Sequence, residues 1–476
     1  AAGALSSSEN TGIGASVAVN VLSSDVQALV GNNLAWRPGV LGNGVTNSVK
    51  ANWSVNELLV DAKSSGQSGA FGVAGALAKT KEEQKKQDEV AKEDGGGDSG
   101  SSSLAGSFSE AILQTLSNGL AGVDGGLKAA SDKASSVKDS IVEVPGKLKG
   151  YWDKFKSMVS GKGGDAGGEG EPGSKLSLAI AGSGTINVSG QKNRAHLGDI
   201  VLDPRDPAKG SKVTVLSLNQ TNQFSGAGGG ALTLAGGKKS EFSSAIAGAV
   251  AYNHLYNVTE ALLDDVTLNN NDLLKVQAVS AGDQVAMGLG LAVATAGETN
   301  VAVALSGSGA VVTNTTRAAV VDGTINQRSS APGSIEVTAY DRSRLLIGGG
   351  SFAGSKGKGT SVGGSLALGV ISNQLLAEWL GSTASNFATF DLSANSAARV
   401  LAGAIAVAVS TGNESSAGSG SLFVVVLNNQ IKARVDANNG KASSLKGGAV
   451  NVDARSVSNL AALDSLFSAA AQTALK

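Results

Sequence analysis

The chain has 476 residues, of which 38 are basic, 39 are acidic and 66 are glycine, and it contains no cysteine. The balanced charge excludes the basic footprint of a nucleic-acid-binding domain, and the lack of cysteine excludes disulfides and thiol chemistry. A long chain without cysteine is more typical of exported bacterial proteins than of cytosolic ones. Glycine this abundant without a triplet period excludes a collagen helix, and no apolar run reaches the length of a membrane-spanning helix.

Two kinds of strand-like segment recur along the chain. One is typified by residues 450–454, where Val450, Val452 and Ala454 alternate with polar residues, as in a strand with one buried face. The other carries a central alanine. Successive copies lie 53 to 66 residues apart, except for one step of 155 in the first series and one of 167 in the second. The inward positions that we predict for the core of the repeats are Val60, Val215, Val276, Val337, Phe390 and Val452, and Ala28, Ala195, Ala261, Ala318, Ala377 and Ala433.

This repeat predicts an all-β fold, a parallel β-helix or solenoid of about six units of about sixty residues. Each unit has too little apolar bulk to close a core of its own, so neighbouring units must stack to bury one. Because sixty residues exceed one narrow coil, we expect two or three rungs in each unit, joined by right-handed crossovers. The first unit occupies residues 1–80, and units two to six occupy residues 175–476.

The first unit begins with a strand at 14–21 and ends in a tail of small residues at 68–77. Similar segments rich in Gly and Ala follow later strands, at 285–291 and 402–407. Glycine weakens the preference for a strand, but it lets neighbouring backbones approach closely. We therefore expect unusually tight packing wherever these tails lie.

An insertion at 81–174 interrupts the repeats and accounts for the oversized first step. It begins with a charged and then glycine-rich linker, and it ends in another glycine-rich stretch. Between them the apolar residues recur at three- and four-residue spacing, which predicts helices at about 104–123, 127–142 and 145–161. Repeat arrays accept such insertions in the loops between their strands.

The last of these helices carries most of the aromatic residues of the insertion. Basic amphipathic helices bind partner grooves or lie on membrane surfaces, so this helix is a candidate contact site, and a membrane-active toxin is one alternative function. The competing interpretation, which we favour, is that its apolar face packs against the rest of the protein, because short isolated helices rarely persist in water. The candidate contact residues are Lys147, Tyr151, Trp152, Phe155 and Lys156.

Candidate catalytic groups are few. The two histidines, His196 and His254, lie in strand-like segments without a motif partner, which is typical of structural histidines. Some parallel β-helices cleave acidic polysaccharides with clustered Asp, Arg and Lys, so a polysaccharide-acting enzyme is a second alternative. No basic partner recurs beside the acidic groups, which favours charged turns, and we predict no enzyme activity, catalytic residue, cofactor or metal site. The acidic groups in question are Asp264, Asp265 and Asp272, and Asp199, Asp203 and Asp206.

Three motifs of the repeats resemble a known family. Residues 14–21 read Gly-x-Ser-Val-x-Val-Asn-x, residues 25–28 read x-Val-x-Ala, and residues 450–456 read Val-x-Val-x-Ala-x-Ser. This combination is similar to the leukotoxin-type filamentous adhesins, which are large bacterial surface proteins like the filamentous passengers of type V secretion. The resemblance covers all six units but not the insertion, and no catalytic residue carries over from it.

The resemblance implies export, display at the bacterial cell surface, and an adhesive or scaffolding role, for example in a biofilm. The chain begins with Ala1 and a repeat starts at once, so we expect a processed piece of a larger polypeptide. Expected partners are neighbouring repeats or further copies stacked end to end through open strand edges, and a glycan or protein on a cell surface. We expect no nucleic acid, and membrane contact only under the toxin alternative.

Overall fold

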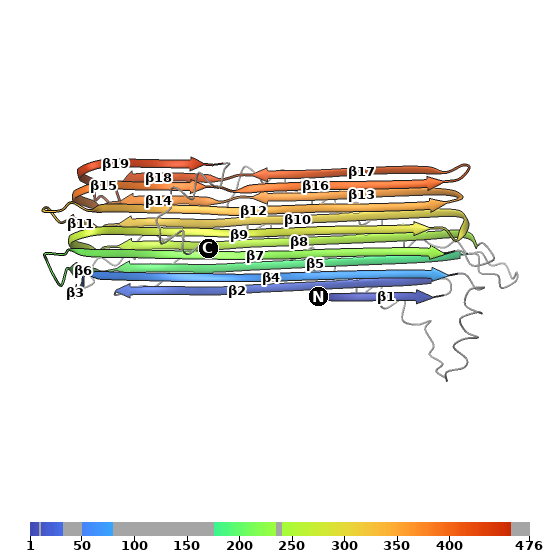
Figure 1. Ribbon diagram of the computed structural model, residues 1–476, viewed down its shortest axis with the longest axis horizontal. Helices are drawn as coiled ribbons and strands as arrows, with labels where there is room; N and C mark the ends of the chain where they lie inside the picture. Colours follow the sequence, from blue (N-terminus) through green and yellow to red (C-terminus); the bar gives the residue numbers. More distant parts are fainter. Residues whose placement is uncertain (9–10, 32–49, 80–175, 235–239, 458–476) are drawn as a thin grey trace, which may run out of the picture.

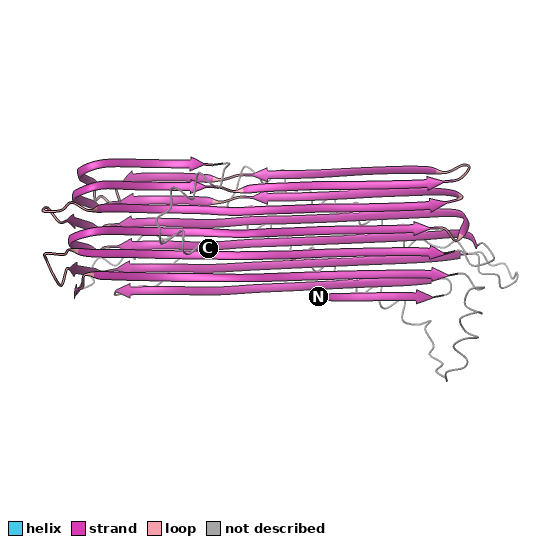
Figure 2. Ribbon diagram, viewed as in Figure 1, coloured by secondary structure: helices cyan, strands magenta, loops and turns pink. Residues whose placement is uncertain are grey.

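The computed structural model describes residues 1–8, 11–31, 50–79, 176–234 and 240–457. These residues form nineteen strands and no helix, and all the strands pair in parallel within two sheets (Figure 2). The prediction of an all-β chain with parallel strands is confirmed. The whole predicted insertion at 81–174, with its three helices, lies outside the described residues.

Sheet A has eleven strands and sheet B has eight. The strands of sheet A are β1 (Ala2–Ser8), β3 (Ala51–Ser54), β4 (Glu57–Lys79), β6 (Ile200–Asp203), β7 (Ser211–Leu234), β9 (Thr267–Ala294), β11 (Thr324–Gln327), β12 (Ser334–Lys356), β15 (Thr383–Ser396), β16 (Arg399–Thr411) and β19 (Ser444–Ser456). The strands of sheet B are β2 (Thr11–Gly31), β5 (Leu176–Gly198), β8 (Ser240–Asp264), β10 (Gly297–Val321), β13 (Lys358–Ile371), β14 (Gln374–Leu380), β17 (Ser416–Leu427) and β18 (Gln430–Asp436).

The chain alternates between the two sheets, and each pass pairs with the pass one repeat later (Figure 1). In sheet A, for example, β9 follows β7 in register and β12 follows β9. β11 and β12 both pair with β9 and β15 because they lie end to end along one pass. The arrangement is consistent with a parallel β-helix.

The expected two or three rungs per repeat are wrong. Each repeat makes one pass through each sheet, and a single strand such as β9 is 28 residues long. The dipeptide Asn428-Asn429, which reads as a sharp turn, only separates β17 from β18 along one pass. Short polar breaks therefore do not reverse the chain here, because the strands on both sides are held in line by the neighbouring passes.

The alanine series forms one continuous ladder in sheet B. Ala28 pairs with Ala195, and the ladder continues through every later pass to Ala433. The members from Ala195 to Ala377 are fully buried, whereas the first and last are partly buried because each lies on the outermost pass.

The valine series in sheet A follows the same rule with one correction. Val60, Val215, Val276 and Val337 pair in register from pass to pass and are buried. Phe390 is buried but two residues out of register, since it pairs with Ile335 and Val450, while Leu392 pairs with Val337 and Val452. The last member, Val452, is 46% exposed because β19 is the outermost described pass of the sheet.

The interior changes along the strands. One end, which we call the aliphatic half, is filled by large side chains from the first part of the sheet A passes and the last part of the sheet B passes. Its largest fully buried residue is Trp379, whose Nε1 donates to the Ser382 carbonyl at 2.9 Å and whose ring meets Phe390 edge-on at 5.0 Å.

The opposite end, which we call the alanine half, has an interior of small residues. One core cluster there consists entirely of alanines: Ala74, Ala76, Ala78, Ala179, Ala181, Ala231, Ala245, Ala247, Ala292, Ala294, Ala302, Ala304 and Ala353. The two sheets come together closely: a Cβ on Gly288 would lie 2.4 Å from the Gly307 carbonyl oxygen across the interior. The close approach expected for the glycine-rich tails is confirmed.

Candidate functional site

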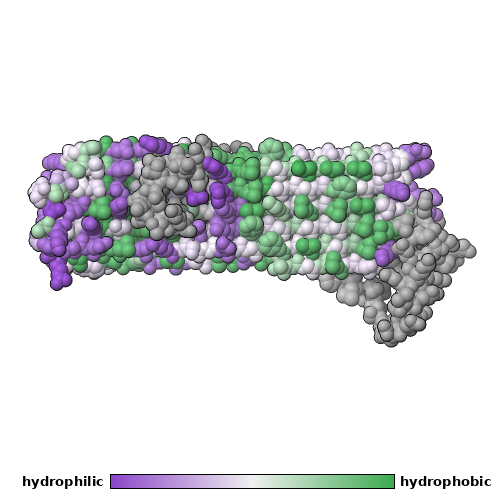
Figure 3. Space-filling model, in the orientation of Figure 1, coloured by the Kyte–Doolittle hydropathy of each residue, from purple (hydrophilic) through white to green (hydrophobic). Residues whose placement is uncertain are grey.

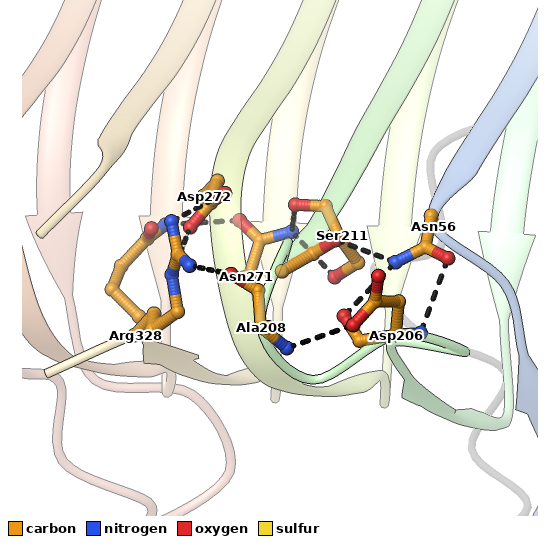
Figure 4. Close-up of polar contacts among 9 residues, drawn as sticks. Asn56, Asp206, Ala208, Ser211, Asn271, Asp272 and Arg328 are labelled. Atoms are coloured by element: carbon orange, nitrogen blue, oxygen red, sulfur yellow. Dashed lines mark hydrogen bonds and ion pairs between the residues drawn. The ribbon is translucent and has the colours of Figure 1, made fainter. Parts of the chain in front are cut away.

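Two of the acidic residues singled out from the sequence, Asp206 and Asp272, lie at the aliphatic end of sheet A (Figure 4), Asp206 in the bend between β6 and β7 and Asp272 near the start of β9. Asp272 accepts from Arg328 through both carboxylate oxygens, at 2.9 and 3.1 Å, and Arg328 also donates to the Ala208 carbonyl. The Asp206 carboxylate accepts a hydrogen bond from the backbone N–H of Ala208 at 3.1 Å. The Asn56 side-chain amide donates a hydrogen bond to the backbone carbonyl of Asp206 at 3.3 Å. Both carboxylates are thus engaged in holding the bend.

The neighbouring aspartates have a conformational reason for their positions. Asp199, Asp265 and Asp322 stand at the same bend of successive repeats, with φ of 53°, 49° and 54°. Asp and Asn tolerate this left-handed region better than other residues with a side chain. Asp265 also pairs with Lys50 at 2.9 Å.

Asp203 accepts from Asn269 at 3.0 Å, which links two successive passes. A general acid and base for polysaccharide cleavage would need carboxyl groups facing a groove with pKa values moved apart. The carboxylates of Asp265 and Asp272 are instead paired with cations, that of Asp203 accepts a hydrogen bond from an amide, and that of Asp206 accepts one from turn backbone. Their geometry is that of bend-stabilising groups.

The two histidines lie apart on the outward side of sheet B. His196 is 1% exposed, and burial, together with the positive charge of Arg194, lowers its pKa to about 3. His254 stands between the rings of Tyr252 and Tyr256, at 6.5 and 5.7 Å, and burial lowers its pKa as well. Both are therefore neutral imidazoles at neutral pH, and neither faces a carboxylate in the manner of a catalytic pair.

A buried polar layer separates the two halves of the interior, and the sequence reasoning missed it. Its most unusual member is Asp341, which is fully buried and accepts from Ser343 at 2.8 Å, Asn373 at 2.7 Å and Asn314 at 3.3 Å. Burial raises the pKa of Asp341, and these hydrogen bonds act in the opposite direction. Since its oxygens are occupied by donors, this carboxylate serves to order the polar layer and is poorly suited to bind a cation.

A second missed feature is an ion-pair network on the outward side of sheet B. Glu378 accepts from Arg317 at 2.7 Å and from Arg434 at 2.9 Å, joining three successive passes. The Arg317 and Glu378 side chains are 9% and 3% exposed. The signal in the sequence was present, because Arg194, Glu260 and Arg317 occupy one register column with alternating charge.

The outer surface of the alanine half is the third missed feature and the largest. Small residues face inward there, so the large apolar residues of the same strands face outward. On β9, Met287, Leu289 and Leu291 are 45%, 63% and 49% exposed. Figure 3 shows hydrophobic residues gathered over this half of the molecule and hydrophilic ones over the other. The signal was the alternation of Gly or Ala with Leu, Val or Phe in the glycine-rich tails.

The sites predicted in the insertion, Lys147, Tyr151, Trp152, Phe155 and Lys156, lie outside the described residues. In the part of the chain that the structure describes, no three His, Asp or Glu side chains come together as a metal site. None of the described segments is a helix long and apolar enough to cross a bilayer. Comparison of the chain with protein-family models, with curated proteins and with solved structures found no match.

Proposed function

We propose that this chain is a structural and adhesive segment of an exported bacterial surface protein, built as a right-handed β-helix of about six repeats of sixty residues. The observation that carries the proposal is the alanine ladder, which runs in register through all six passes of sheet B. A ladder of identical residues on a repeating coil is the basis of a rigid rod that grows by addition of repeats. Such a rod suits attachment or extracellular scaffolding.

The described polar groups support a non-enzymatic role. Asp272 is paired with Arg328, Glu378 with two arginines, and Asp341 with three polar side chains. A hydrolase would need at least one carboxyl group free to exchange protons with a substrate. The family resemblance of the repeats supports the same role and an extracellular location.

Electron microscopy of the purified chain tests the architecture. We expect flat particles whose long dimension is about 90 Å, the length of a 28-residue strand at about 3.3 Å per residue. Particles that join along the stacking direction would extend into filaments. Round particles without a long dimension would contradict the proposal.

The adhesive part needs a separate assay. Binding of the chain to a glycan array and to immobilised cell-surface proteins should give retention of at least one class of ligand, without release of new reducing ends. Release of reducing sugar from an acidic polysaccharide would contradict the non-enzymatic role. The variant Asp272→Asn is the matched control, because it removes the charge of the best candidate acid at the bend.

A further inference from the structure

The outer surface of sheet A in the alanine half is a flat, wholly apolar grid. Five outward positions on each of β4, β7, β9, β12 and β16 lie in register, so the grid has twenty-five positions. They are the odd-numbered positions of 69–77, 285–293 and 401–409 and the even-numbered positions of 224–232 and 346–354, and every one is Gly, Val, Leu, Ile, Phe or Met. We call this surface the apolar face.

Polar residues mark the edges of the apolar face. The column on the side of the aliphatic half runs Gln67, Asn222, Asp283, Arg344 and Arg399. On the other side, Lys79 and Lys356 end β4 and β12. The polar column therefore bounds the apolar face along the strands on the side of the aliphatic half.

The face is smooth because its glycines accept the large side chains of neighbouring passes. A Cβ on Gly226 would lie 3.0 Å from Phe71, and one on Gly350 would lie 2.8 Å from Leu289. The large side chains thus lie across the glycines and remain open to solvent, with Ile405 69% exposed and Leu289 63% exposed. Single exposed apolar residues are ordinary, but a contiguous area of this kind marks an interaction surface.

The size of the face fits a protein interface. Each position covers about 6.6 Å along the strand by 4.8 Å across it, so twenty-five positions cover about 800 Å². A stable protein–protein interface buries about 800 Å² on each partner. Two sheets that pack face to face do so through such apolar surfaces, about 10 Å apart.

We propose that the apolar face binds the same face of a second copy of this chain, so that two rods pack side by side. A bilayer fits less well: among the described residues, the strands at the two ends of the stack pair on one side only, and unpaired strand edges are not tolerated in hydrocarbon. The bend beyond the face also carries Lys358 paired with Glu414. The equivalent surface of sheet B is a poorer partner because it includes Tyr252 and His254. A second copy supplies an area of equal size, flatness and apolarity.

The symmetry of such a dimer singles out one residue. Leu289 occupies the central position of the central strand, with Val73 and Gly228 on one side and Gly350 and Ile405 on the other. A twofold axis through the centre of the face brings Leu289 of one copy opposite Leu289 of the other. This lateral pairing differs from end-to-end stacking, which uses the strand edges.

The experiment compares the mass of the full chain in solution over a range of concentrations by light scattering and sedimentation. We expect twice the chain mass at high concentration, and an association about 100-fold weaker in Leu289→Lys. Leu59→Lys is the matched control, because Leu59 is 60% exposed on the same sheet but outside the face. Val250→Lys tests sheet B, where Val250 is 55% exposed. Both controls should associate like the parent chain.

A cross-linking experiment tests the same contact without Leu289→Lys, in case the lysine disturbs folding. Because the chain has no cysteine, Leu289→Cys introduces the only thiol, and oxidation should link two copies by a disulfide, whereas Leu59→Cys should stay unlinked. A parent chain that stays monomeric throughout, loss of association in Val250→Lys only, or no cross-link at Leu289 would each overturn the proposal. Flotation of a monomeric chain with phosphatidylcholine vesicles, lost in Leu289→Lys, would overturn it in favour of lipid.

Discussion

The two ends of β9 follow the same alternation of inward and outward residues, yet they bury opposite kinds of side chain. In the aliphatic half, Val276 is buried inside and Lys275 lies outside. In the alanine half, Gly288 faces inward and Leu289 is 63% exposed. The difference shows that the size of the inward residues sets the distance between the sheets, and that large apolar residues are excluded wherever the sheets come too close.

The two halves consequently depend on different forces. The aliphatic half buries large apolar surface, which contributes about 25 cal/mol per Å² removed from water. The alanine half buries little apolar surface per residue, so its stability rests on the backbone ladders and on the close fit of small groups. Substitutions in the two halves should therefore fail for opposite reasons: lost volume in one and added volume in the other.

The largest effect is expected for Trp379→Ala, which removes the largest fully buried side chain of the aliphatic half. The lost burial and the cavity left behind should lower the free energy of unfolding by about 4 kcal/mol. Ala302→Gly, which removes a single methyl group inside the alanine half, should lower it by about 1 kcal/mol. Chemical denaturation measures both, and equal losses would contradict the contrast between the halves.

Gly288→Ala in the alanine half should lower the free energy of unfolding by about 2 kcal/mol, which is less than the loss expected for Trp379→Ala. The new methyl group would lie 2.4 Å from the Gly307 carbonyl oxygen, so the sheets would have to separate. The control is Gly230→Ala, whose methyl group would have no neighbour within 4 Å. Thermal unfolding followed by circular dichroism should show a lower midpoint for the first variant alone. A similar midpoint in both would mean that the sheets are not in contact there.

The pH dependence of the unfolding free energy tests how well the outward side chains of the aliphatic half are buried. Burial lowers the pKa of His196 from 6.5 in the unfolded chain to about 3. Between these values the unfolded chain binds a proton that the folded chain does not, so the free energy of unfolding falls as pH decreases from 6.5 to 3. In His196→Leu this contribution should disappear, and the stability difference between variant and parent should grow in favour of the variant as pH falls. Denaturation at pH 4 and pH 7 measures it; a constant difference would contradict the burial of His196.

The smallest effect is expected at the border between the halves. Asp283 and Arg344 form a salt bridge whose side chains are 42% and 45% exposed. Exposed pairs contribute about 0 to 1 kcal/mol, so Asp283→Ala should change the unfolding free energy by about 0.5 kcal/mol. The effect should shrink further in 1 M salt. A loss several times larger in chemical denaturation would show that the border couples the two halves.

Much of the fold could be predicted from the sequence because the repeats are in register. The alanine series identified one ladder of sheet B, and the valine series identified most of a ladder of sheet A. Phe390 was misplaced by two residues because Phe390 and Leu392 are both buried on the same face of β15, and alternation does not say which of the two continues the ladder. The length of the strands was missed because local turn signals such as Asn428-Asn429 are overridden by pairing with the passes on either side.

The surface features were harder to predict. Alternation indicates which residues share a face, but it does not say which face is buried when both small and large apolar residues alternate. The apolar face could not be predicted for this reason, because large apolar residues are usually assumed to lie in the interior. The buried ion pairs around Glu378 require knowing which passes are neighbours. Once the register is known, both features follow from the sequence.

The strand length also limits how the gene can change. Losing one codon inside β9 would turn every later residue of that strand to the opposite side, placing Leu289 between the closely spaced sheets. The bends carry no such parity requirement: two residues separate β8 from β9, whereas 96 separate β4 from β5. Insertions and deletions compatible with folding should therefore occur at the bends, at the two ends of the strands. Length variation between strains is expected there, and the same bends are the best sites for engineered fusions.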